Sequence, residues 1–251
     1  MSSWSQRRRF LYIAIALIVA VGAIGVPVFF ALYRAPTCFD GIQNGGEQGV
    51  DCGGACQKLC ASSFLPPSVS WTRFEQVAPN TYNLAAYIIN PNIDGAASDV
   101  PYEMVVYDQQ GVPIANEKGT VSLPPHRNTL AFVSGVTVGK RTPVKALFQF
   151  TGAPNWFKQA DPLSVLNIGN KDYRENAAGS SLGVTIENPS VEPLRNIRVS
   201  AVLYDTAGNA LGFSETAIDE IPAQGSALAP FTWPESHGGK VVSIEVLPVA
   251  E

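Results

Sequence analysis

Met104–Gly111 reads MVVYDQQG, and Ala201–Gly208 reads AVLYDTAG. Each stretch begins with apolar residues typical of a β-strand and ends in Tyr-Asp-x-x-Gly. This ending is typical of a tight turn, because Asp accepts hydrogen bonds from turn amides and Gly adopts a positive φ. Tyr107 and Tyr204 are 97 residues apart, and the two glycines keep the same spacing. The chain is therefore expected to contain two copies of one strand–turn unit.

Other features of the two copies keep nearly the same spacing. They are separated by 97 or 98 residues and consist of Asn90-Pro91 with Asn188-Pro189, Pro125 with Pro222, and Val144–Phe148 with Val242–Val246. One spacing shared by several unrelated residue types indicates two homologous domains rather than coincidence.

Short apolar runs separated by Pro, Gly, Asn and Asp predict six strands in each copy. The expected strands of the first copy are 69–75, 82–89, 102–107, 113–121, 129–136 and 144–150. Those of the second copy are 163–168, 182–187, 197–204, 210–218, 226–231 and 241–247. This strand number matches an immunoglobulin-like β-sandwich, in which two facing sheets bury their inner faces. The predicted fold class is mainly β, with two tandem sandwiches.

The strand endings MVVYD and AVLYD, preceded by INP or ENP and followed by Gly, resemble FxLYD domains. These are small immunoglobulin-like β-sandwiches of bacterial envelope proteins. The resemblance covers most of each copy. The Phe of the motif is replaced by Met104 and Ala201, and its Leu is Val106 in the first copy. The resemblance implies a β-sandwich in the cell envelope and brings no catalytic residues.

Phe10–Tyr33 is an apolar segment of 24 residues without a charge. As a helix it extends about 36 Å, enough to cross a hydrocarbon core of about 30 Å. A cleaved signal peptide is the alternative, but its apolar region has only about 7–15 residues. Three arginines precede the segment and one follows it, which predicts a cytoplasmic amino end. We therefore expect an uncleaved signal anchor that places the remaining chain outside the cytoplasm.

All cysteines lie in the next segment, at Cys38, Cys52, Cys56 and Cys60. Outside the cytoplasm thiols are usually oxidised, so four cysteines predict two disulfide bonds. Three pairings are possible, and the sequence does not select one. A zinc site is less consistent with the pattern, because paired C-x2-C motifs and a neighbouring histidine are absent. A C-x-x-C redox pair is absent as well.

Oxygen-bearing side chains lie between Cys38 and Cys52 on a glycine-rich stretch: Asp40, Asn44, Glu47 and Asp51. Such residues are typical ligands of calcium, and the spacing partly matches an EF-hand loop. The alternative is that Asp, Asn and Gly only form tight turns. The segment also resembles a cysteine-rich segment of bacterial cell-surface proteins, a resemblance that implies no activity.

The charge and the motifs limit the function. The residues after position 34 carry 13 basic and 21 acidic side chains, a formal charge of −8, which disfavours nucleic-acid binding. The G-x-S-x-G, H-E-x-x-H, P-loop and G-x-G-x-x-G motifs are absent. His126 and His237 lie in turns and are expected to be exposed, and Trp156 is expected at the junction of the copies. No enzymatic activity is predicted.

The expected segments are a cytoplasmic tail (1–9), a transmembrane helix (10–33), a cysteine-rich module (34–62) and two sandwiches (63–152 and 153–251). The expected function is that of a single-pass membrane protein with a periplasmic or extracellular binding or scaffolding region. Its partner would be an envelope protein or a surface polymer, and its only candidate cofactor is calcium. The alternative is an extracytoplasmic redox or metal-dependent enzyme that uses the cysteine segment, which free thiols after purification would favour.

Overall fold

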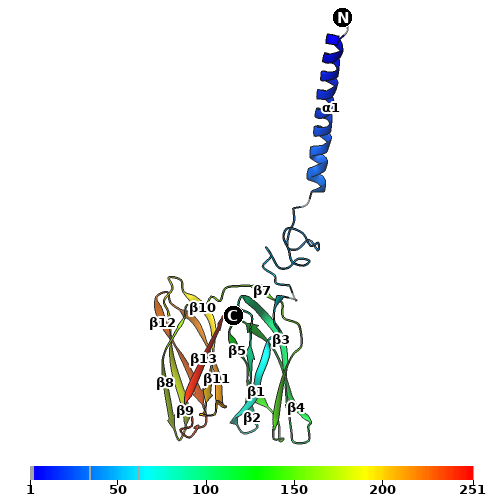
Figure 1. Cartoon of the computed structure of the whole chain (residues 1–251). Helices are drawn as coiled ribbons and strands as arrows, with labels where there is room; N and C mark the ends of the chain where they lie inside the picture. Colours follow the sequence, from blue (N-terminus) through cyan, green and yellow to red (C-terminus); the bar gives the residue numbers. More distant parts are fainter. Residues whose placement is uncertain (1–2, 34, 61–62, 251) are drawn as a thin grey trace. The chain divides into compact units, whose positions relative to one another are not determined.

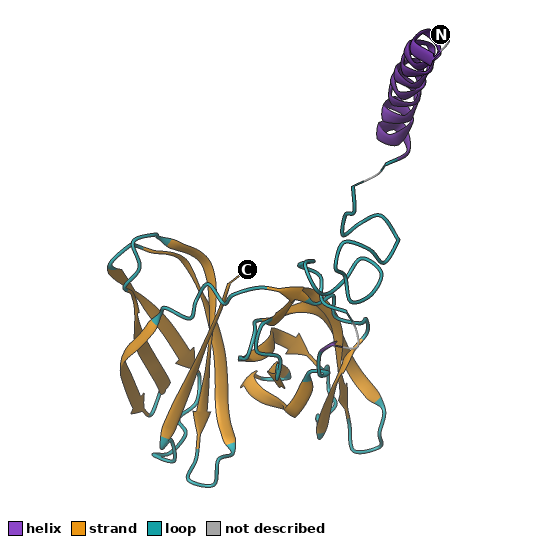
Figure 2. Cartoon of the chain, turned by 45° about the horizontal axis from the view of Figure 1, so that its top comes forward, coloured by secondary structure: helices purple, strands orange, loops and turns teal. Residues whose placement is uncertain are grey.

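A computed structural model describes residues 3–33, 35–60 and 63–250. The chain divides into two compact units, Met1–Ala55 and Cys56–Glu251 (Figure 1). The first unit contains one helix followed by loops, and the second contains all the strands (Figure 2). The predicted fold class is confirmed: the chain is mainly β, with an apolar helix, disulfide bonds and several antiparallel sheets.

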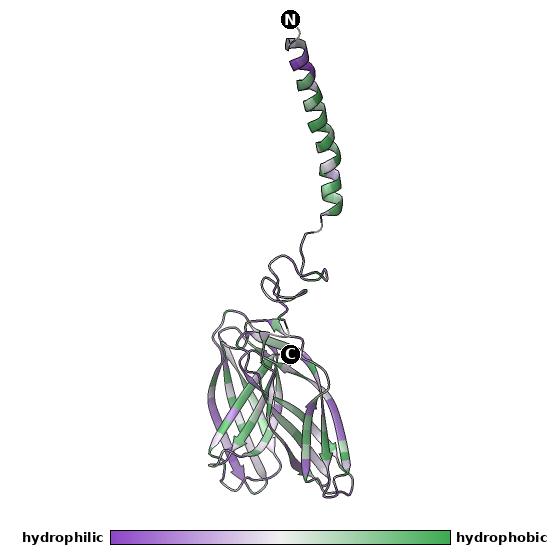
Figure 3. Ribbon diagram, turned by 45° about the vertical axis from the view of Figure 1, so that its right-hand side comes forward, coloured by the Kyte–Doolittle hydropathy of each residue, from purple (hydrophilic) through white to green (hydrophobic). Residues whose placement is uncertain are grey.

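Helix α1 of the first unit spans Ser3–Leu32 and continues through Pro27. Within it, Gln6–Leu32 is long and apolar enough to cross a membrane. Its apolar side chains are exposed, including Ile18 and Val21 at 72% and 70%. Figure 3 shows that most of the helix is coloured as hydrophobic. A helix that is apolar all round is suited to an apolar surrounding rather than to water.

The first strands of the second unit form a β-sandwich. It consists of two antiparallel sheets, ordered β1-β2-β5 and β4-β3-β6. The strands are β1 (Ser68–Ala78), β2 (Thr81–Ile89), β3 (Gly95–Tyr107), β4 (Pro113–Leu123), β5 (Asn128–Thr137) and β6 (Lys145–Phe150). Between the sheets lies a closed core that includes Leu84, Met104 and Leu123, all fully buried.

A second sandwich follows, with sheets ordered β12-β9-β8 and β11-β10-β13. Its strands are β8 (Asn167–Asn176), β9 (Gly179–Asn188), β10 (Leu194–Tyr204), β11 (Ala210–Ile221), β12 (Gly225–Trp233) and β13 (Ser243–Ala250). Its core contains Val184, Ile186 and Leu203, among other apolar residues. Each sandwich therefore buries its own apolar residues between two sheets.

The connection between the sandwiches contains the short strand β7 (Phe157–Lys158), which the sequence did not predict. β7 pairs with Gly95–Ala96 at the start of β3. The segment Gln57–Leu59 pairs with the same connection: the Lys158 amide donates to the Gln57 carbonyl at 2.6 Å, and the Leu59 amide donates to the Trp156 carbonyl at 2.9 Å. The chain therefore enters and leaves the first sandwich along neighbouring segments.

All twelve expected strands overlap an observed one, but 163–168 shares only its last two residues with β8. Leu163 lies in a turn, where its amide donates to the Asp161 carboxylate, and the strand β8 starts only at Asn167. The predicted bounds were wrong because β8 is an edge strand of polar residues, several of them exposed, whereas the prediction placed the strand on the apolar residues before it.

The two sandwiches form matching hydrogen bonds at matching positions. The Asn90 side-chain amide donates to the carbonyls of Leu123 and Pro124, and that of Asn188 donates to the carbonyls of Ile221 and Pro222. Pro124 rather than Pro125 thus takes the place of Pro222, so the spacing at this point is 98 residues. Homology of the two sandwiches stays a prediction that these contacts support.

Candidate functional site

The cysteine segment holds two disulfide bonds, Cys38–Cys56 and Cys52–Cys60, and none of the four cysteines has a free thiol. The pairing is interleaved, first with third and second with fourth. The sequence left three pairings open, and the structure selects this one. A segment of this length cannot bury a core of its own, so its cross-links restrict the unfolded chain and hold the loops in place.

The four candidate calcium ligands lie in the same segment. The carboxylates of Asp40, Glu47 and Asp51 accept hydrogen bonds, whereas the Asn44 side chain donates one to Asp40. The Asp40 carboxylate accepts from the Thr37 and Ile42 amides and from the Asn44 side chain, which lowers the pKa of Asp40. The Asp51 carboxylate accepts from the Gly41 amide at 3.0 Å, and one Glu47 oxygen accepts from the amides of Asn44 and Asp51. These contacts close turns, and calcium binding at the loop stays a prediction.

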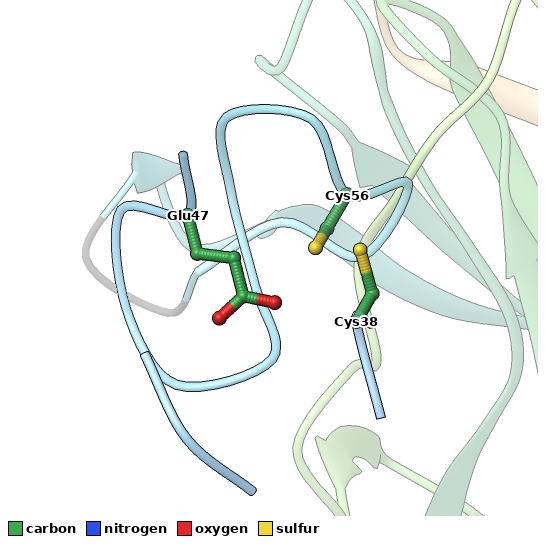
Figure 4. A group of neighbouring side chains, drawn as sticks. All are labelled: Cys38, Glu47 and Cys56. Atoms are coloured by element: carbon green, nitrogen blue, oxygen red, sulfur yellow. The ribbon is translucent and has the colours of Figure 1, made fainter. Parts of the chain in front are cut away.

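The Glu47 carboxylate also lies close to one disulfide bond. Figure 4 shows Cys38 and Cys56 with their sulfur atoms directed at each other and Glu47 beside them. One ligand atom from each of the three residues lies within 4.8 Å of the others. A sulfur in a disulfide bond is not a thiolate, and a thiolate is the form that binds metals. The arrangement is therefore a cross-link beside a carboxylate.

Polar and apolar contacts join the two sandwiches at a junction between them. The outer face of β2 and β5 meets the outer face of β10, β11 and β13 in a third apolar cluster. The buried members are Ala85, Tyr87, Leu130, Val202, Ala210, Phe213 and Leu247. The sheets therefore lie in four layers with three apolar contacts between them.

Aromatic side chains occupy the centre of this junction. The ring of Trp71 on β1 stacks on Tyr87 with centroids 5.5 Å apart and contacts Phe213 at 6.2 Å. Phe132 on β5 meets Phe213 edge-on at 6.3 Å. Phe213 is 2% exposed, so it is held by residues of the other sandwich as well as its own. Such aromatic contacts add to the stability gained from burying apolar area.

One carboxylate joins the two sandwiches at the edge of the aromatic cluster. The Tyr87 hydroxyl donates to Glu245 at 2.7 Å, and the Tyr204 hydroxyl donates to the other oxygen of Glu245 at 2.9 Å. The Asn128 side chain donates to the Tyr87 hydroxyl. Burial raises the pKa of both tyrosines, and the neighbouring Glu245 carboxylate raises it further. Both hydroxyls therefore stay protonated and act as donors.

Arg127, which precedes β5, forms a second polar connection. Its guanidinium forms an ion pair with Asp161 of the connection at 2.6 Å. It also donates to the carbonyl of Leu163 at 3.1 Å and to that of Pro248 on β13 at 3.3 Å. Because a planar guanidinium offers several donors in fixed directions, one side chain ties three segments together.

His237 is packed inside the molecule rather than exposed, so that expectation was wrong. Its side chain is 9% exposed, and its Nε2 lies 3.8 Å from the Glu75 carboxylate of β1. Its Nδ1 lies 3.0 Å from the Ser180 hydroxyl and 3.1 Å from the Tyr173 hydroxyl. The Ser180 hydroxyl donates to the Glu235 carbonyl, so these contacts hold a turn against the first sandwich. His126 is exposed, as expected.

The tryptophans are distributed differently from the prediction. Trp156 belongs to the core of the first sandwich, where it is 1% exposed and contacts Phe64 at 4.9 Å. Trp71 instead packs at the junction, and Trp233 lies in the second core. Trp156 follows the end of β6 but folds back over that sandwich, which a reading along the chain did not reveal.

No family model matches the chain, and no curated protein matches it either. Solved structures that match part of the chain include a putative β-galactosidase from Bacteroides fragilis, with 12% identity over 69% of this chain and a TM-score of 0.23. A β-glucuronidase from glycoside hydrolase family 2 has 10% identity over 69% of this chain and a TM-score of 0.24. Red sea bream transglutaminase has 13% identity over 76% and a TM-score of 0.23. The chain spans 33%, 24% and 32% of those three proteins, respectively.

Proposed function

We propose that this is a single-pass membrane protein whose disulfide-bonded and β-sandwich regions lie outside the cytoplasm and bind or organise another envelope component. The observation that carries the proposal is α1, whose apolar side chains are exposed on every face. A helix of this kind is stable in the hydrocarbon core of a bilayer and unfavourable in water.

The cysteines support the extracytoplasmic location and a structural role for their segment. Two disulfide bonds within 23 residues are typical of an oxidising compartment. Bonded cysteines are consistent with a cross-linked spacer between the helix and the sandwiches. The partner we propose is an envelope protein or a surface polymer, in line with the resemblance to FxLYD domains.

The junction supports a binding or scaffolding role. Two sandwiches that share an apolar cluster and the Tyr87–Glu245–Tyr204 contacts present their loops and strand edges at fixed positions. A preorganised surface loses less conformational freedom on binding than a flexible one. Edge strands such as β8 offer unpaired backbone groups that can recognise an extended partner.

Membrane anchoring is tested by placing a charge in α1. Val21→Lys is expected to release the protein from membranes during alkaline extraction, because a lysine in the centre of a bilayer is costly. Val191→Lys is the matched control: Val191 is 79% exposed in a loop of the second sandwich, and this variant should stay in the membrane fraction. Release of the control, or retention of Val21→Lys, would contradict the anchor.

Location and binding are tested in intact cells. A protease added from outside should remove a tag placed after Glu251, and chemical cross-linking should join the full chain to an envelope component. A tag that stays protected until the cells are opened would contradict the orientation. Absence of any cross-linked product at native expression would contradict the binding role.

A further inference from the structure

A cleft of about 290 Å³ opens beside the junction, between the two sandwiches. Strands of both sandwiches form its walls: β3, β4 and β5 on one side, and β10, β11 and β13 on the other. Its volume is close to the lower end of the range of small-molecule sites, about 300–1,000 Å³. A cleft between two fixed domains is a common place for a ligand to bind.

A partly compensated carboxylate lies in the wall of this cleft. The Glu215 side chain is 15% exposed and accepts a hydrogen bond from the Ser200 hydroxyl at 3.0 Å. The Arg198 Nε lies 3.6 Å away, longer than a hydrogen bond. Burial raises the pKa of Glu215 to about 7, against the opposing effects of Arg198 and Ser200. The surroundings of Glu215 therefore disfavour its ionised form. A cation in addition to Arg198 would stabilise the ionised carboxylate.

Asp99 lines the opposite wall and is exposed. It follows the start of β3 in a register shift and has a φ of 52°, an uncommon backbone conformation for a residue other than glycine. Among the residues that the structure describes, the wall thus contains two carboxyl groups and one guanidinium. Its formal charge is −1 when both acids are ionised, which favours a cationic ligand.

Hydroxyl groups form most of the remaining polar wall: Ser98, Thr120, Ser122, Thr129 and Ser200. Thr129 is only 2% exposed as a residue, and it lines the cleft together with the other hydroxyl-bearing residues. A ligand with several hydrogen-bonding groups could pair with these hydroxyls when it displaces water from the cleft.

We propose that this cleft binds a small polyhydroxylated amine, with the ammonium group between Glu215 and Asp99 and the ligand hydroxyls against the serine and threonine side chains. The carboxylates select the positive charge, and the hydroxyl wall selects a ligand rich in hydroxyls. The inference deepens the proposed binding role by naming a ligand class, and it does not depend on the membrane location.

Binding is expected to depend on pH, because an ammonium group prefers the ionised form of Glu215. The charged and titratable groups that interact with Glu215 are Arg198 on β10 and Tyr102 on β3, and Asp99 lies in the wall of the same cleft. Burial raises the pKa of the Tyr102 hydroxyl, so it stays neutral at physiological pH. Glu215 is then the group that changes its charge near neutral pH, and binding should release its proton.

The first experiment compares two ligands of the full-length chain in detergent micelles by isothermal titration calorimetry. D-glucamine is a primary amine with hydroxyls on the remaining carbons, and sorbitol replaces its amine by a hydroxyl. At pH 7.5 glucamine should bind, and sorbitol should bind at least tenfold more weakly. Equal affinity of the two, or no heat of binding with glucamine at millimolar concentration, would overturn the proposal.

The second experiment uses variants and pH. Glu215→Gln should weaken glucamine binding at least tenfold, whereas Glu220→Gln, on the same strand but paired with Arg195 outside the cleft, should leave it unchanged. Thr129→Val should weaken binding severalfold. Lowering the pH from 7.5 to 5.5 should weaken binding to the unchanged protein about tenfold and have little effect on Glu215→Gln.

Equal affinities of Glu215→Gln and Glu220→Gln, or affinity independent of pH, would overturn the cleft proposal. Melting curves of each variant show whether it is folded. Membrane extraction and external proteolysis, which test the proposed function, do not involve glucamine. A failure of the ligand proposal is therefore distinguishable from a failure of the anchor.

Discussion

Single residues fix the loops at the end of each sandwich. Asn188 is 1% exposed, and its side-chain amide donates to three backbone carbonyls, while its oxygen accepts from the Ser190 amide at 3.0 Å. Asn90 has matching contacts in the first sandwich. A buried amide that satisfies several backbone groups leaves them unpaired when it is removed. The sequence showed the Asn-Pro pairs as a repeated feature, but it did not show that the asparagine side chains bond to backbone carbonyls.

The turn after each Tyr-Asp pair was predictable at the same scale. The Asp108 carboxylate accepts from the amides of Gln110 and Val112, and Asp205 accepts from those of Ala207 and Asn209. Gly111 and Gly208 have φ values of 74° and 78°. Residues close together in the chain form this turn, so the sequence was sufficient to predict it. The Glu245 contacts join residues 158 positions apart, and no local pattern announces them.

Asn188→Ala is expected to destabilise the protein by about 1–3 kcal/mol, because buried carbonyls lose their donor. The measurement is chemical denaturation of the full chain. Asn116→Ala is the matched control: Asn116 is exposed on β4, and its replacement should change stability by about 0.5 kcal/mol or less. Equal losses in the two variants would contradict the role given to Asn188.

Glu215 predicts a dependence of stability on pH. Its pKa rises from 4.5 to about 7 on folding, so the folded protein binds a proton that the unfolded chain releases. Stability from this group is present below about pH 4.5 and is lost as the pH rises toward 7. Glu215→Gln should therefore be more stable than the unchanged protein at pH 8, by on the order of 2 kcal/mol.

Melting temperatures at pH 5 and pH 8 measure this effect. The advantage of Glu215→Gln should be small at pH 5 and larger at pH 8. An advantage that is the same at both values, or larger at pH 5, would show that burial of the Glu215 charge is not its cause.

At the level of elements, the strands fall into two groups. Strands with regular apolar residues were predicted with approximate bounds, whereas β7 was missed and β8 was predicted to start and end too early. β8 is polar and lies at an edge, and β7 has two residues that form a strand only because β3 and Gln57–Leu59 lie beside it. Edge strands need few apolar residues, and β8 contains charged side chains such as Lys171 and Arg174.

The cysteine segment depends on its cross-links, whereas the sandwich cores contain no cysteine. Reduction with dithiothreitol should therefore make the segment around 38–55 sensitive to proteases while the sandwiches keep their melting transition. Limited proteolysis with mass spectrometry locates the cuts, and oxidised protein is the control. Simultaneous loss of both regions would contradict this separation.

The calcium hypothesis makes its own prediction for the same segment. If the loop of Asp40, Asn44, Glu47 and Asp51 binds calcium, millimolar calcium will protect it from proteolysis in oxidised protein, as mass action requires. Asp51→Asn would then reduce the protection. Magnesium at the same concentration is the control for ionic strength, and equal protection by both ions would identify a screening effect.

For the whole molecule, the sequence predicted two sandwiches but not that they form one body. The signal was present in two strands, because Leu84–Ile88 and Val199–Leu203 are buried at every position. Strands buried on one face alternate, and continuous burial indicates that both faces are covered. One face of β2 meets its own sandwich core, and the other meets the second sandwich. The pattern of a strand does not tell which part of the protein covers its second face, because that depends on the tertiary structure.

Phe213→Ala tests the coupling of the sandwiches. Removing this ring should cost about 3–5 kcal/mol, because it leaves a cavity between Trp71 and Phe132. Calorimetry should then resolve two transitions in place of one. Phe157→Ala is the control, since Phe157 is 44% exposed, and it should retain a single transition. One unchanged transition in Phe213→Ala would contradict the coupling.

The pairing of Gln57–Leu59 with Trp156–Lys158 has a mechanical consequence. A tensile force applied to the chain at Cys56 and at the second sandwich pulls on neighbouring points, because the Lys158 amide is bonded to the Gln57 carbonyl. In this antiparallel geometry the bonds are loaded one after another, in the manner of a zipper. These hydrogen bonds would break first and let the chain extend, so the core of the first sandwich would not bear the force until they had opened.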